Sequence, residues 1–72
     1  MNLLIFRTDI KTKEEVKVIN NPLTNHPQID SWSIDMEDID KVLRIEAQAD
    51  LAEHEVISLV KTYGFECEVL PD

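Results

Sequence analysis

The feature that most constrains the fold of this 72-residue chain is the order in which the spacing of its apolar residues changes. In three segments apolar and polar residues alternate, and in a fourth, at the start, apolar residues occupy both faces; both patterns are typical of strands. In two other segments apolar residues recur every three or four positions, which is the pattern of one helix face. The expected strands are 2–8, 29–36, 42–47 and 65–70, and the expected helices are 12–25 and 50–64.

This order of elements leaves few ways to build a core. Each helix has to bury its apolar stripe, and an antiparallel sheet offers one face for helices to cover. The split β-α-β arrangement satisfies both requirements. We therefore predict an α+β fold, a ferredoxin-like β-α-β-β-α-β sandwich in which two helices cover one face of a four-stranded antiparallel sheet. A single domain is expected over residues 1–72.

Both expected helices have recognisable ends. Thr12 and Glu15 are spaced as a capping box, in which each side chain bonds the backbone N–H of the other residue. Asp50 and Glu53 repeat this spacing, so the second helix is expected to begin at Asp50 with the same device. Gly64 is the only glycine in the chain, and we expect it to end that helix in a left-handed conformation.

The net charge of the chain limits the classes of molecule that it is expected to bind. Fifteen acidic residues against seven basic residues give a formal net charge of −8. Nucleic acids and anionic membrane surfaces repel such a chain, so neither is expected as a partner. A basic protein surface suits it, and so does the simpler role of keeping a small domain in solution. The apolar run near the start is too short for a signal peptide or a membrane span, and a cytoplasmic protein is expected.

Three stretches together resemble a known family. They are the strand ending FRTDIK, the hairpin SWSIDMEDIDKVLRIEA and the closing VISLVKTYGFECEVL. In this order and at this length the chain is similar to the heavy-metal-associated domain, the fold of copper chaperones and of the amino-terminal modules of metal-transporting ATPases. The resemblance implies a ferredoxin-like fold and a Cys-x-x-Cys motif after the first strand, whose two thiolates hold Cu(I) or another soft ion.

In this chain the two family cysteine positions fall on Thr12 and Glu15. A hydroxyl and a carboxylate are hard oxygen donors and cannot replace two thiolates for a soft ion. Our leading hypothesis is a non-enzymatic domain that lacks the metal site and a cofactor, and that acts in protein interaction or regulation. The alternative is heavy-metal binding or transport through non-thiolate ligands such as Glu15, Asp9 or a histidine. An amino-acid-binding regulatory domain of similar topology is disfavoured, because no glycine follows the first strand.

Other residues that could carry chemistry have simpler interpretations. Cys67 shares a strand face with Phe65 and should behave as a buried apolar group. His54 is expected on the solvent side of its helix, and His26 near the carbonyl end of the first helix. No nucleophile, base and acid fall in a recognisable pattern, so an enzyme is not expected. The acidic hairpin is read as a solvated turn rather than a calcium loop; its acids are Asp35, Glu37, Asp38 and Asp40.

One feature predicts contact with another molecule. If Leu4 and Phe6 face the helices, the alternate residues of the first strand point to the uncovered face of the sheet. The expected apolar patch on that face consists of Leu3, Ile5, Val42 and Leu70. Clustered aliphatic side chains on an open sheet face often mark a homodimer or partner contact. Scattered surface aliphatics that need no explanation are the competing interpretation.

Overall fold

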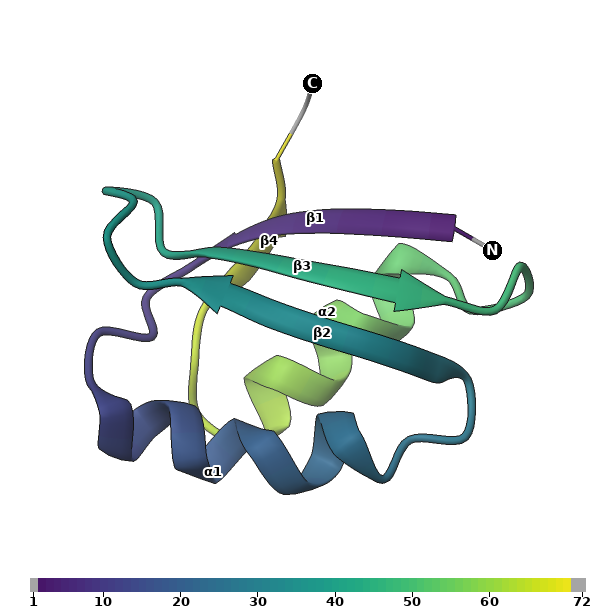
Figure 1. The fold of residues 1–72 in the computed structure, drawn as a ribbon, viewed down its shortest axis with the longest axis horizontal. Helices are drawn as coiled ribbons and strands as arrows, with labels where there is room; N and C mark the ends of the chain where they lie inside the picture. Colours follow the sequence, from purple (N-terminus) through teal and green to yellow (C-terminus); the bar gives the residue numbers. More distant parts are fainter. Residues whose placement is uncertain (1, 71–72) are drawn as a thin grey trace.

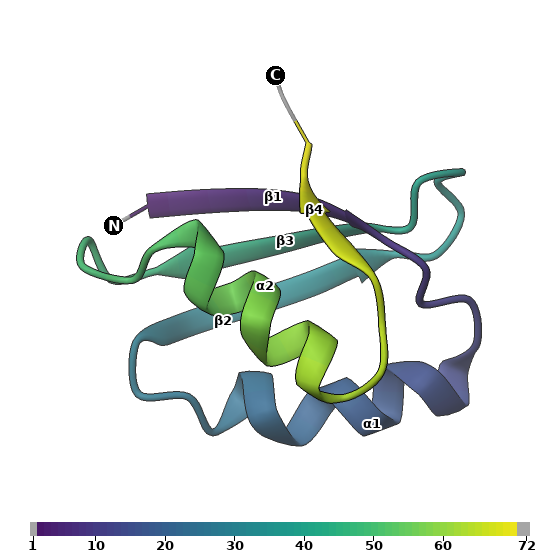
Figure 2. The same cartoon turned by 180° about the vertical axis from the view of Figure 1, so that it is seen from behind.

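The computed structural model describes residues 2–70, which form a four-stranded sheet and two helices (Figures 1 and 2). The elements follow the predicted order, with strands of alternating pattern and helices between them. In chain order they are β1 (Asn2–Thr8), α1 (Lys13–Thr24), β2 (Ile29–Asp35), β3 (Val42–Ala47), α2 (Glu53–Thr62) and β4 (Cys67–Val69). The predicted fold is confirmed.

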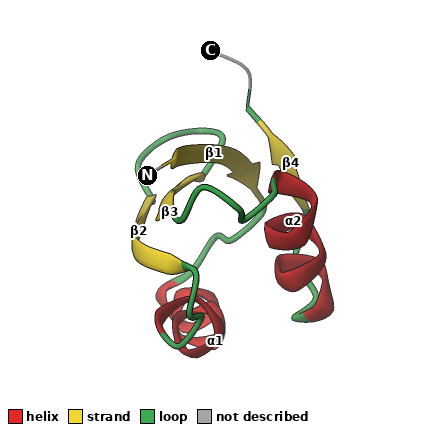
Figure 3. Cartoon of the chain, turned by 90° about the vertical axis from the view of Figure 1, so that its right-hand side faces the viewer, coloured by secondary structure: helices red, strands yellow, loops and turns green. Residues whose placement is uncertain are grey.

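The sheet has the strand order β2-β3-β1-β4, and its three strand pairs are antiparallel. Seen from the end, both helices lie on one side of the sheet and the other side is open (Figure 3). The register places Leu4 opposite Ile45 and Phe6 opposite Leu43, and these side chains point toward the helices. Phe6, Leu43 and Ile45 are completely buried.

The first helix begins as its sequence predicts. Thr12 is its N-cap, and the reciprocal capping box with Glu15 is present. Ile19 and Leu23 are completely buried on the face that meets the core. Pro22 stands inside the helix and removes one backbone donor from its last turn. The local start signal was therefore sufficient to place this helix.

The second helix begins later than predicted. Its N-cap is Ala52, and Asp50 lies in the preceding turn. The reason is Leu51, which is buried in the core and is held by a turn in which its N–H bonds Gln48 O at 3.1 Å. Burying Leu51 costs the chain its first possible helical turn. Glu55 closes half of a capping box by accepting from the Ala52 N–H at 2.8 Å, and the alanine side chain has no oxygen with which to complete it.

The end of α2 and the final strand agree only in part with the prediction. Gly64 ends the helical region with φ +93°, as expected. Tyr63 is the C-cap of α2 and is 44% exposed, because it lies beyond the last helical turn. The final strand is shorter than 65–70, although Phe65 and Cys67 are buried as predicted. Val69 points to the core side but is 40% exposed, since β4 is an edge strand. Across residues 2–70, no helix has the length and apolar character needed to cross a membrane.

Candidate functional site

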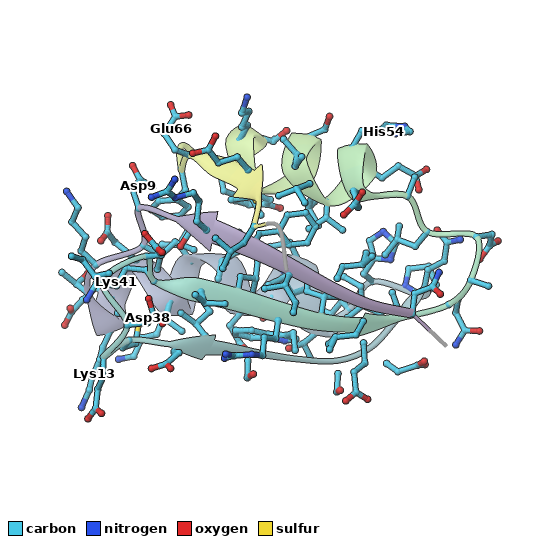
Figure 4. The ribbon with its side chains drawn as sticks, turned by 90° about the horizontal axis from the view of Figure 1, so that it is seen from above. Asp9, Lys13, Asp38, Lys41, His54 and Glu66 are labelled. Carbon is cyan, nitrogen blue, oxygen red and sulfur yellow. The ribbon has the colours of Figure 1, made fainter. Side chains whose placement is uncertain are left out.

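The loop between β1 and α1 is where the resemblance places a metal site, and here it is anchored at both ends. Ile10 is completely buried in the core. The Asp9 carboxylate oxygen Oδ1 accepts from the backbone N–H of Glu66 at 2.9 Å, which joins the loop to the segment before β4. Figure 4 shows Asp9 and Glu66 beside each other near one end of the molecule. Thr8 Oγ1 donates to Lys41 O at 2.8 Å and so joins the loop to the β2–β3 hairpin.

The side chains of Thr12 and Glu15, which the resemblance equates with the family's two cysteines, bond the loop itself. Thr12 Oγ1 accepts from the Glu15 N–H at 3.1 Å. Glu15 Oε1 accepts from the backbone N–H groups of Lys11, at 2.9 Å, and of Thr12, at 3.1 Å. The same oxygen lies 3.4 Å from Thr12 Oγ1. The negative Glu15 also stands in the first turn of α1, where the helix dipole favours it. This pair therefore acts as a helix start.

Replacing the cap should weaken the domain measurably. We expect Thr12→Ala to lower the free energy of unfolding by about 1 kcal/mol, because the Glu15 N–H loses its acceptor. In a domain of this size that corresponds to a fall in Tm of roughly 4–8 °C. Thermal unfolding followed by circular dichroism measures the effect. Thr12→Ser, which keeps the hydroxyl, is the matched control and should unfold near the wild-type temperature; equal Tm values for all three proteins would contradict the structural role of the cap.

The histidines are not brought to this loop. His54 lies in the first turn of α2, toward the end of the molecule opposite Asp9 (Figure 4). His26 follows the last turn of α1. Because this helix has 12 residues, His26 lies roughly 18 Å along the helix axis from the capping box. Its Nδ1 accepts from the Gln28 N–H at 3.1 Å. Within residues 2–70, no three histidine, cysteine or acidic side chains are grouped so that they could hold a metal ion.

The acidic side chains of the hairpin form hydrogen bonds and an ion pair. Asp35 Oδ1 accepts from the Glu37 N–H at 3.1 Å, and Asp38 Oδ1 accepts from the Asp40 N–H at 2.8 Å. The Asp40 carboxylate also pairs with Arg7 at 2.8 Å, and this distant partner on β1 could not be read from the local sequence. Lys41 adopts a left-handed backbone with φ +47°. Its ammonium group donates to Met36 O at 2.7 Å, and these contacts fix the shape of the turn.

Cys67 lines a groove next to the β1–α1 loop. The groove has a volume of about 500 Å³ and is lined by Arg7, Thr8, Asp9, Lys61, Glu66, Cys67 and Glu68. The thiol itself is buried, as predicted. Burial raises its pKa from 9.0 to about 12, an effect that the nearby Lys61 opposes and Glu68 reinforces. The groove therefore contains a neutral thiol rather than a nucleophilic thiolate.

This environment makes Cys67 slow to react. At pH 8 the raised pKa reduces the thiolate population about a thousandfold relative to an exposed cysteine. We expect iodoacetamide to leave the folded protein unmodified over a time in which the protein in guanidinium chloride is alkylated completely, as followed by mass spectrometry. Because the folded pKa is the higher one, the thiol's contribution to stability is present below about pH 9 and is lost between about pH 9 and 12. Equal alkylation rates in the two states would contradict this account.

The predicted apolar patch on the open face of the sheet is smaller than expected. Leu3 is 58% exposed, and Ile5 and Leu70 are half-buried. The Leu70 N–H bonds Ile5 O at 3.0 Å, which keeps the two residues adjacent. Val42 is only 2% exposed and cannot offer a contact surface. The β2–β3 hairpin rises on the side of the sheet away from the helices, at the end where β3 begins, and this accounts for the burial of Val42 (Figure 1).

Comparison with known proteins finds similarity in structure only. No protein-family model matches the chain, and no curated protein sequence matches it. A chain in the solution structure of the Atx1–Cu(I)–Ccc2a complex matches with a TM-score of 0.85 and 15% identity, covering 100% of this chain and 99% of that one. The yeast copper transporter domain Ccc2a, solved in apo and Cu(I)-loaded states, matches with a TM-score of 0.84, 15% identity and the same coverage.

The CsoZ metallochaperone gives a further match, with a TM-score of 0.78 and 15% identity over 93% of this chain and 96% of that one. The descriptions of all three structures name metal-handling proteins. The resemblance that the sequence predicted is thereby confirmed in three dimensions. At this level of identity the likeness establishes architecture alone. The chain has the fold of the matched copper-transporter and metallochaperone domains, and its sequence contains one cysteine, Cys67.

Proposed function

We propose that this protein is a metal-free relative of the heavy-metal-associated domain that works as a protein-interaction or regulatory module. One observation carries the proposal. At the loop where a soft ion would be held, the side-chain oxygens of Thr12 and Glu15 bond the loop's own backbone. A helix start that satisfies its own donors offers no ligands to spare for a soft cation.

Ligands for a different cation are equally scarce at this loop. One carboxylate oxygen of Asp9 is bonded to Glu66 N–H, and one of Glu15 is bonded to two backbone N–H groups. Hard cations such as Ca²⁺ require six to eight oxygen ligands, which two partly used carboxylates do not supply. The histidines lie elsewhere on the molecule. The placement of these residues therefore supports the metal-free proposal over metal handling through non-thiolate ligands.

Two observations support an interaction role. The matched Atx1–Cu(I)–Ccc2a structure is a complex of two proteins, so a domain of this fold can form a protein contact. The net charge of −8 would attract a basic partner over distances up to about the Debye length, near 8 Å at physiological salt. We expect the acidic surface to select such partners and to repel nucleic acid. The open sheet face offers a second contact surface, on which apolar residues lie beside residues of both charges.

The test of this proposal is a metal titration of the wild-type protein. Cu(I) and Zn(II) are offered in competition with a chromophoric chelator, and the protein is expected not to remove either metal from the chelator. Glu15→Ala and Asp9→Asn are measured beside the wild type as controls for weak binding at the loop. A sub-micromolar affinity of the wild type that Glu15→Ala abolishes would overturn the proposal in favour of a non-thiolate metal site.

A further inference from the structure

The open face of the sheet carries two rows of side chains whose chemistry is self-complementary. In one row, Leu3 of β1 stands opposite Glu46 of β3, and in the next, Ile5 stands opposite Arg44. All four residues point away from the core, because their neighbours Leu4, Phe6 and Ile45 point into it. The apolar side chains of Leu3 and Ile5 on β1 therefore lie beside one acidic and one basic side chain on β3.

Two charged residues on this face, Arg44 and Glu46, have no ion-pair partner among the described residues. Both residues are exposed. The other arginine on this face, Arg7, is by contrast bound to Asp40 at 2.8 Å and lies 3.7 Å from Glu68. Arg44 and Glu46 can therefore pair with another molecule without giving up an internal contact.

We propose that this face binds a second copy of the chain, face to face, about a twofold axis. The axis lies in the plane between the two sheets. It runs perpendicular to the strands and passes midway between the Leu3–Glu46 row and the Ile5–Arg44 row. Such an axis stacks β1 on β1 and β3 on β3 in opposite directions, as an isologous contact requires. Leu3 then meets Ile5 of the second copy, and Arg44 meets Glu46 of the second copy, each pair occurring twice.

The neighbouring strand β2 is consistent with the same axis. On β2, Ser31 belongs to the Glu46 row and Ser33 to the Arg44 row, so small polar side chains meet each other at that border. No like charges are opposed in either row. Two packed sheets stand about 10 Å apart with strands within about 30° of each other, which leaves room for one layer of side chains from each copy.

The contact should be weak. The free part of the face is bounded at one end by the hairpin that buries Val42, so it falls short of a standard protein interface. We expect a dissociation constant between about 10 μM and 1 mM. The inference rests on the proposed interaction role and names one partner for it. Metal binding in the titration above would remove the proposed function, whereas a monomeric protein would remove only the self-association.

The test is sedimentation equilibrium of the wild type and surface variants, at protein concentrations up to about 1 mM in about 0.15 M salt. Leu3→Lys should weaken dimerisation at least tenfold. Val18→Lys, which changes a 47% exposed valine on α1 outside this face, is the matched control and should leave it unchanged. Circular dichroism confirms that each variant is folded.

A charge-reversal cycle makes the test specific to the proposed axis. Arg44→Glu and Glu46→Arg should each weaken dimerisation about tenfold, because each opposes like charges twice. The double variant Arg44→Glu/Glu46→Arg should recover wild-type affinity within about threefold. A wild type that is monomeric at the highest concentration would overturn the proposal. Failure of the double variant to recover would overturn the axis and with it the proposal.

Discussion

The double variant Thr12→Cys/Glu15→Cys is expected to bind Cu(I) in competition with a chromophoric chelator, while the wild type leaves the metal with the chelator. Positions 12 and 15 stand three residues apart across the start of α1, which is the spacing that the resemblance gives for the two thiolates of a Cys-x-x-Cys motif. The helix N-terminus also favours negative charge and lowers the pKa of a thiol placed there. Two soft thiolates would then replace two hard oxygens.

The variant gives up its capping box, so a matched control is needed. Thr12→Ser/Glu15→Gln changes the same two positions but keeps a hydroxyl acceptor and a side chain that can bond back to the N-cap. This control should stay folded and should not take Cu(I) from the chelator. Single cysteine variants should bind far more weakly than the double variant. A folded double variant without Cu(I) affinity would contradict the assignment of Thr12 and Glu15 to the family's cysteine positions.

Phe6→Ala should cause the largest loss of stability among single substitutions in β1. Phe6 is completely buried, opposite Leu43 on one neighbouring strand and Val69 on the other. Truncating a buried phenylalanine costs about 3–5 kcal/mol. A domain of 72 residues has roughly 4–11 kcal/mol of total stability, so the variant should be marginally stable or unfolded. The free energy of unfolding is measured by urea denaturation followed by tryptophan fluorescence.

The control for this prediction is Val18→Ala, which removes two methyl groups from a valine that is 47% exposed on α1. Its free energy of unfolding should stay within about 0.5 kcal/mol of the wild type. If Phe6→Ala unfolded at a urea concentration close to that of Val18→Ala, the core that joins β1 to both of its neighbours would be wrongly described. The expected difference between the two variants in the free energy of unfolding is large compared with the error of the measurement.

Elements whose causes lie within a few residues were predicted well. The Thr12–Glu15 capping box needs only residues three apart, and the alternation in β1 and β3 needs only the strand itself. The turn at Gly64 depends on one residue that tolerates φ +93°. The burial of Cys67 and Phe65 likewise followed from the pattern of β4. These features depend on residues close together in sequence, and contacts with distant segments did not change them.

The outcomes that the sequence did not predict depended on segments far apart in the chain. Asp50 has the composition of an N-cap, but the core takes up Leu51, and α2 begins only after that turn. Val42 has the right position for the open face, but the β2–β3 hairpin encloses that end of the sheet. The Arg7–Asp40 pair, which orders the acidic hairpin, joins residues 33 apart. None of these outcomes is visible in a pattern of three or four residues.

The amino-acid sequence by itself determined the order of elements, the start of α1 and the absence of thiols at positions 12 and 15, because periodicity, capping and ligand chemistry act through neighbouring residues. Only the tertiary structure decided that the Asp9 carboxylate accepts a hydrogen bond from the Glu66 N–H, 57 residues away. It also decided that Leu3 pairs with Glu46 and Ile5 with Arg44 in two adjacent rows on the open face of the sheet. Strand register sets those positions, and register depends on how the whole core packs.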